Sequence, residues 1–212
     1  MTSRDPGREQ PRGGGSGKRE AILAGALSVF ARDGYAGASI DAISAEAGVS
    51  TRTIYNHFTD KAGLFQQVLE HSSTSAAEAQ IRIIDRHLRK VTDLEADLVD
   101  FGRAWVTPMP THADHFRLVQ RLGAESGSAV ETATSTWRQA GPVRVRAELS
   151  ARLGELASQR VLTVDDPDRA ALHLMLLVSA GLPTQPDVAP TPDEITEAVT
   201  AGVRAFLHGY GT

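Results

Sequence analysis

Apolar residues recur at helical spacing along most of the chain. From Lys18 to Asp33 an apolar side chain occurs every three or four residues, and Gly34 follows directly. This period puts the apolar side chains on one face of an α-helix, and a glycine just after such a run is typical of a helix end. The pattern therefore predicts a first helix over 18–33 that packs by one face.

The next stretch, from Ser39 to Phe58, predicts two short helices joined by a tight turn. Ser39 is a favourable N-cap, and the residues after it give a short helix with one apolar face. Gly48 suits the left-handed conformation that closes a helix, and Ser50 can cap the helix that follows. Two short helices with this spacing are typical of a helix-turn-helix.

The second of these helices carries more hydrogen-bonding groups than packing requires. Between Thr51 and Phe58 only Ile54 and Phe58 are clearly apolar, whereas the others present hydroxyl, guanidinium, amide and imidazole groups. A helix-turn-helix places its second helix in the DNA major groove. The candidate DNA contacts are the polar residues of this segment and one lysine after it: Ser50, Thr51, Arg52, Thr53, Tyr55, Asn56, His57 and Lys61.

These candidates suit two kinds of DNA contact. Thr51, Arg52 and Thr53 lie at the start of the helix, where base edges are contacted. Tyr55, His57 and Lys61 suit phosphate contacts. Lys61 begins the following helix, where a cation opposes the helix dipole, so a bound phosphate would relieve the mismatch. Arg52 fits either kind: it could bind guanine O6 and N7, worth about 1–3 kcal/mol of discrimination, or lie along a phosphate.

The same region resembles the DNA-binding domain of TetR-like one-component transcriptional regulators. The matching residues lie in register between positions 18 and 65: Ile22, Leu23, Ala26, Phe30, Gly34, Tyr35, Ala47, Gly48, Val49, Ser50, Tyr55, His57, Phe58 and Lys61. The resemblance implies phosphate contacts by the matching tyrosine, histidine and lysine. The chain departs from the usual pattern at Arg52, where the family often has glycine, and at Ala62, where it often has glutamate.

Helical patterning continues to the C-terminus, and no strand pattern stands out. Further helices are predicted at about 61–88, 94–106, 111–122, 126–139, 142–160, 167–182 and 192–207. The expected fold is all-α, with a three-helix DNA-binding head followed by a larger helical domain. The expected divisions are a disordered arm over 1–17, the helix-turn-helix domain over 18–62, and an effector-binding and dimerisation domain over 63–212. The arm's Arg4, Arg8 and Arg12 are either a solvated leader or DNA contacts.

The predicted helix over 167–182 is apolar nearly all round. Such a helix is either central in its own domain or covered by a partner. TetR-like proteins place a dimer interface at their two terminal helices, and this resemblance favours a homodimer joined by a four-helix bundle. The candidate interface residues are Leu172, Leu176, Ser179, Val199, Val203 and Phe206.

The middle of the chain is rich in large aromatic residues and contains a few polar ones, a combination that is typical of small-molecule cavities. The candidate pocket residues are Phe101, Trp105, Met109, His112, Phe116 and Trp137. Aromatic residues at helical spacing are equally typical of an ordinary core. The resemblance implies a cavity whose occupation by a small hydrophobic ligand lowers the affinity for DNA.

Composition narrows the function classes. The chain has 212 residues, a net charge of −4 and no cysteine, so it offers neither disulfides nor thiolate metal ligands. Catalytic and phosphate-loop motifs are missing, and His112 and His115 have only Asp114 beside them. We expect no enzyme, no cofactor and no metal site.

The expected setting and partners follow from the same observations. No apolar run reaches the roughly 18 residues of a membrane span, so we expect a cytoplasmic protein without a membrane partner. The expected partners are an inverted-repeat duplex DNA, a second copy of the chain and an unidentified small-molecule effector. The alternatives are an activator or a protein-controlled regulator of the same fold, and a helical ligand-binding protein that does not act on DNA.

Overall fold

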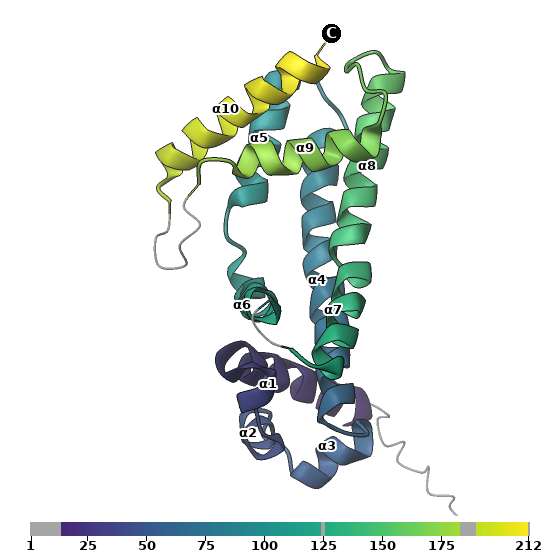
Figure 1. Cartoon of the computed structure of the whole chain (residues 1–212), viewed down its shortest axis with the longest axis vertical. Helices are drawn as coiled ribbons and strands as arrows, with labels where there is room; N and C mark the ends of the chain where they lie inside the picture. The colour runs from purple at the N-terminus through teal and green to yellow at the C-terminus, as the bar shows by residue number, and fades with distance from the viewer. Residues whose placement is uncertain (1–13, 124–125, 183–189, 212) are drawn as a thin grey trace, which may run out of the picture. The chain divides into compact units, whose positions relative to one another are not determined.

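The structure, a computed structural model, describes residues 14–123, 126–182 and 190–211 (Figure 1). Within these ranges the regular structure is helical, as predicted, and the one β-type contact is an isolated bridge between Leu162 and Gly211. The helices are α1 (Gly14–Gly37), α2 (Ile40–Glu46), α3 (Thr51–His57), α4 (Lys61–Leu88), α5 (Leu94–Val106), the 3₁₀ helix η1 (Pro110–His112), α6 (Ala113–Leu122), α7 (Ser128–Ala140), α8 (Pro142–Ser158), α9 (Pro167–Ser179) and α10 (Pro192–Tyr210).

Side-chain caps explain where several helices begin. Asp93 Oδ1 accepts a hydrogen bond from the Ala96 N–H at 3.1 Å at the start of α5. Asp166 caps α9, and the backbone N–H of Arg169 that it accepts lowers the pKa of its carboxyl. α10 begins with a capping box in which Glu194 accepts the backbone N–H of the N-cap residue, an interaction that lowers the pKa of Glu194. The sequence predicted the starts of these three helices.

The first helix is longer than predicted. α1 begins at Gly14, so residues 14–17 are helical instead of belonging to a disordered arm. Gly34 breaks the regular helix with φ 74° and ψ 173°, as predicted, but one further helical turn follows and ends at Gly37. The rest of the expected arm, including its three arginines, lies in 1–13, outside the described residues.

The chain forms two compact units. The head unit contains the described residues up to His71 together with Asp114–Ala133, and the body unit contains Ser72–Ala113 and the described residues from Thr134 onward. The sequence assigned 114–133 to the second domain, whereas the structure packs this segment with the DNA-binding helices. Three side chains of α6 within this segment are buried, those of His115, Leu118 and Leu122.

An aromatic cluster forms the core of the head unit. Phe30 of α1 lies edge-on to Phe65 of α4, with 4.8 Å between ring centroids, and Tyr35 lies 4.7 Å from Phe65. Phe30 and Phe65 are fully buried. This cluster fixes the end of α1 against the start of α4, and so supports the two short helices between them.

The core of the body unit lies among α5, α8, α9, α10 and the second half of α4. α9 packs against both α8 and α10, and α10 also packs against α5 (Figure 1). Leu98, Phe101, Leu149, Leu174 and Val203 are buried there. No helix in the described part of the chain is long and apolar enough to cross a membrane.

Candidate nucleic-acid interface

The turn between α2 and α3 has the predicted geometry. Gly48 takes φ 64°, in the left-handed region that closes α2 without steric cost for glycine. Ser50 Oγ accepts the N–H of Thr53 at 3.2 Å and thereby caps α3. Ser50 Oγ and Thr53 Oγ1 also hydrogen-bond each other at 2.9 Å, so both hydroxyl groups take part in building the helix start.

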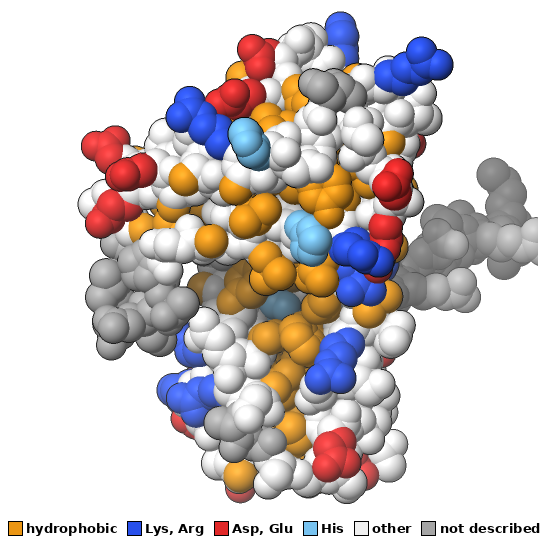
Figure 2. All heavy atoms as spheres, turned by 45° about the horizontal axis from the view of Figure 1, so that its top comes forward, with side chains coloured by type: hydrophobic (Ala, Val, Ile, Leu, Met, Phe, Trp, Pro, Cys, Tyr) orange, Lys and Arg blue, Asp and Glu red, His pale blue; other side chains and the backbone are white. Residues whose placement is uncertain are grey.

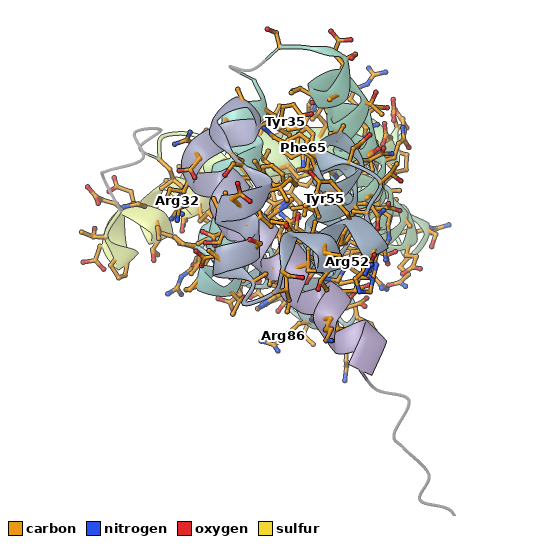
Figure 3. All side chains as sticks on the ribbon, turned by 90° about the horizontal axis from the view of Figure 1, so that it is seen from below. Arg32, Tyr35, Arg52, Tyr55, Phe65 and Arg86 are labelled. Carbon is orange, nitrogen blue, oxygen red and sulfur yellow. The ribbon has the colours of Figure 1, made fainter. Side chains whose placement is uncertain are left out.

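α3 is divided into a buried side and an exposed side. Ile54 and Phe58 are buried in the head unit. Arg52, Tyr55 and Asn56 are exposed, Tyr55 by 56%. Figure 3 labels Arg52 and Tyr55 on this helix. The helix therefore packs by its apolar side and presents a guanidinium, a phenol and an amide.

The remaining candidates on α3 are more enclosed. Thr51 is half-buried, and the half-buried ring of His57 has its centroid 6.3 Å from that of Phe58. Sequence analysis also missed a contact behind this helix: Arg19 lies with its guanidinium 5.8 Å from the Phe58 ring centroid and donates a hydrogen bond to Gln67 Oε1 at 2.6 Å. Arg19 thus connects α1 to the C-terminal end of α3 and to α4.

Lys61 is held at the first turn of α4 by residues that follow the break in α1. Its ammonium group lies 4.7 Å from the centroid of the Tyr35 ring and 3.5 Å from the carbonyl oxygen of Ala36. The face of an aromatic ring attracts a cation, which restricts where this long side chain points. The sequence predicted a phosphate contact for Lys61 but did not indicate that Tyr35 positions its side chain.

A surface ion pair lies on the other side of the head unit. Arg32, labelled in Figure 3, donates from Nε to Asp33 Oδ1 at 2.9 Å and lies 3.9 Å from Glu46 at the end of α2. The hydrogen bond with Asp33 raises the pKa of the Arg32 guanidinium, and the same bond lowers the pKa of the Asp33 carboxyl. The Arg32 guanidinium thus has carboxylate partners, whereas the Arg52 guanidinium of α3 has none among the described residues.

The candidate pocket residues are distributed over both units. In the body unit, the rings of Phe101 and Trp105 lie 5.6 Å apart, and His112 Nε2 lies 3.3 Å from Ser75 Oγ. Trp105, Met109 and Trp137 are half-buried, while Phe116 belongs to the head unit. No group of three or more potential metal ligands occurs among the described residues.

A groove of about 490 Å³ on the body unit is lined by other residues than these candidates. Its walls come from the C-terminal end of α9 and from α10: Leu177, Ala180, Gly181, Glu194, Glu197, Ala198, Ala201, Gly202 and Ala205. The only charged residues of this lining are Glu194 and Glu197 of α10, and the other lining residues are leucine, alanine and glycine. Small side chains on α10 are what leave this space open.

The candidate dimer residues fall into two groups. Leu172, Leu176 and Ser179 are exposed on α9, the two leucines by 40% and 61%. Figure 2 shows hydrophobic side chains gathered on a face of the molecule. Val199, Val203 and Phe206 are instead fully buried within the chain's own core, so their selection as partner contacts was wrong. The strongly apolar face of α10 packs against α5 and α9, and the small residues Ala201 and Ala205 are exposed instead.

Comparison with known proteins agrees with this architecture. A family profile described as bacterial regulatory proteins, tetR family, matches residues 22–68, and one described as AefR-like transcriptional repressor, C-terminal domain, matches residues 96–212. The HTH-type transcriptional repressor NicS of Pseudomonas putida is 35% identical over 122 residues. That match covers 53% of this chain and 58% of NicS, little more than half of either protein.

Solved structures match over nearly the whole chain. A TetR-family transcriptional regulator from Mesorhizobium loti superposes with a TM-score of 0.81 over 96% of this chain and 100% of that chain, at 22% identity, which shows a shared fold. The flavonoid-responsive regulator FrrA superposes with a TM-score of 0.65 over 92% of this chain and 97% of that chain, at 27% identity. With one profile covering the helix-turn-helix and a second covering more than half of the chain, this protein belongs to the TetR family of DNA-binding transcriptional regulators.

Proposed function

We propose that the protein is a homodimeric repressor that binds an inverted-repeat operator through α3 and releases it when a small hydrophobic ligand binds the body unit. The exposed polar side of α3 carries this proposal. Its buried side is fixed by Ile54 and Phe58, so Arg52, Tyr55 and Asn56 are displayed by a rigid support. In this proposal residues 18–62 bind DNA, and the helices of the body unit dimerise and bind the effector.

Repression and dimerisation have separate support. The name of NicS describes a repressor, and its similarity to this chain favours repression over activation. The exposed leucines of α9 lie on a face with a groove of small residues, which suits a self-complementary contact between two copies. A two-fold dimer presents two identical reading helices, so the operator should be an inverted repeat.

Operator selection tests this proposal directly. We expect the purified protein to select inverted repeats from random duplex DNA, with half-site centres about 34–36 Å apart or slightly more, and to bind with two protomers or a multiple of two per site. Affinity should fall steeply with salt because phosphate contacts release counterions. Selection of no shared motif, or binding of a single protomer to an asymmetric site, would contradict the proposal.

The effector part of the proposal rests on the rings of the body unit. Phe101 and Trp105 pack together, and His112 adds a polar group beside Ser75. FrrA, by its name, responds to flavonoids, which are small aromatic compounds. Aromatic ligands such as flavonoids suit a binding site that is lined by aromatic side chains and a few polar groups.

Ligand binding should therefore be visible in intrinsic fluorescence. We expect an aromatic effector to change the emission of Trp105 or Trp137 at the concentrations that release the operator. A coupling of about 1–3 kcal/mol would weaken operator binding by roughly 5- to 150-fold. The measurement is a titration with flavonoids and other hydrophobic aromatic compounds, followed by emission and by DNA anisotropy. If the whole panel leaves both signals unchanged, control by a protein or constitutive binding becomes the better account.

A further inference from the structure

We propose that Arg52 and Asn56 form the base-reading pair of α3, with Arg52 reading a guanine and Asn56 an adenine in each half-site. The inference rests on the proposed function, because it names the bases recognised by the same DNA-binding surface. It depends on which polar groups of α3 lack a hydrogen-bond partner among the described residues, and on which side of the helix they lie.

Two of the hydroxyl groups at the start of α3, those of Ser50 and Thr53, take part in the cap of the helix, and Thr51 is half-buried. Ser50 and Thr53 hydrogen-bond each other at 2.9 Å, and Ser50 also accepts the N–H of Thr53. The Ser50–Thr53 hydrogen bond uses one of the two O–H groups, so at most one of these two hydroxyl hydrogens is left to donate to a base. The imidazole of His57 lies half-buried beside Phe58, so it is less accessible than the exposed groups of the helix.

The position of Ile54 shows which side of α3 faces outward. Ile54 is 1% exposed, and it lies two residues after Arg52 and two residues before Asn56. Two residues correspond to about 200° around an α-helix, so both side chains leave the helix opposite its buried side. Positions i and i+4 are also neighbours on one helix face. Tyr55 is only about 100° from Ile54 and occupies the flank, which suits a backbone contact.

Both outward groups are chemically free. Within the ranges that the structure describes, neither the Arg52 guanidinium nor the Asn56 amide has a hydrogen-bond or ion-pair partner. The guanidinium fork matches the two acceptors O6 and N7 of guanine, whereas the amide supplies the donor and acceptor that match adenine N7 and N6. Neither pairing requires a group to be taken from the folded protein.

The separation of the two residues predicts the spacing of the two bases. Four residues of helix rise about 6 Å, and successive bases of one strand are about 3.4 Å apart along the duplex. The guanine and the adenine should therefore lie within about two base-pair steps of each other. The alternative for Arg52 is a phosphate contact, which would carry no base preference.

Selected operators allow these roles to be separated. Dissociation constants would be measured for the wild type, Arg52→Ala and Asn56→Ala on the selected operator and on duplexes with each base pair of the half-site exchanged in turn. Tyr55→Ala serves as the contrast for a backbone contact. Arg86→Ala, an exposed arginine of α4 in the body unit, controls for the loss of one positive charge.

We expect the wild type to lose roughly 5- to 150-fold in affinity when the guanine is exchanged, and Arg52→Ala to lose most of that discrimination while retaining preferences elsewhere. Asn56→Ala should do the same at the adenine, Tyr55→Ala should weaken all duplexes alike, and Arg86→Ala should change no preference. If the wild type selects an inverted repeat but Arg52→Ala leaves every preference unchanged, Arg52 contacts phosphate and the inference fails. If the wild type selects no repeat, the proposed function itself fails. Because both side chains are exposed, circular dichroism should show native folding for each variant.

Discussion

Replacing Leu176 with aspartate is expected to turn the protein into a monomer and to weaken operator binding by about 100-fold or more. Leu176 is the most exposed large hydrophobic residue of α9, at 61%. In the proposed dimer this side chain is covered by the partner. A carboxylate at that position would have to lose its hydration without gaining a counter-charge, which is costly.

The surface around Leu176 explains why the effect should be large. Leu172 lies one helical turn before it, on the same face of α9, and the neighbouring groove is lined by Ala198, Ala201 and Ala205 of α10. In a two-fold contact each copy can place its leucines against the small side chains of the other. Because the contact is two-fold symmetric, one substitution places two carboxylates in each dimer interface.

Loss of the dimer should lower the affinity for DNA because it removes the avidity of two linked reading helices. Two linked reading helices bind an inverted repeat with an affinity that exceeds that of one helix by about 10²–10⁴. Light scattering gives the mass, and anisotropy with the selected operator gives the affinity. Val143→Asp is the matched control, since Val143 of α8 is 42% exposed and an aspartate is well tolerated near a helix start. A folded Leu176→Asp protein of dimeric mass would place the interface elsewhere.

The helix-turn-helix was predictable because its signals are local. The caps Ser39 and Ser50 act within one helical turn, and Gly48 determines a turn through its own φ. Ile54 and Phe58 were recognisable as the buried side of α3 from spacing alone. These features require no knowledge of which distant element packs against the helix.

Long-range packing was less accessible to sequence reasoning. Periodicity identifies the apolar face of α10 but not the element that covers it, which is why Val199 and Phe206 were assigned to a partner instead of the chain's own core. The packing of α6 in the head unit depends on a tertiary contact of the same kind. The Tyr35 ring beneath Lys61 joins residues 26 positions apart, and no local pattern indicates such a pair.

A second large effect is expected from the addition of a single methyl group in the body unit, in the substitution Gly202→Ala. Gly202 lies where α10 crosses α9, and a Cβ atom there would overlap the backbone carbonyl of Leu177 and come within 3.0 Å of the Val178 nitrogen. Backbone atoms of a packed helix cannot turn aside as a flexible side chain can, so the two helices must separate. Overpacking of this kind typically costs about 1–3 kcal/mol.

Gly209→Ala provides the matched control for this substitution. Gly209 lies in the same helix, and a Cβ atom there meets nothing within 4 Å. Both variants gain helix propensity from alanine, up to about 1 kcal/mol, so the difference between them reports mainly the overlap at the crossing. Gly202→Ala should unfold about 2–12 °C below Gly209→Ala in thermal melts followed by circular dichroism. Since α9 and α10 also carry the exposed leucines and the groove, separating them should weaken the dimer and, through it, operator binding. Equal melting temperatures for the two variants would mean that α9 and α10 do not cross as closely as this.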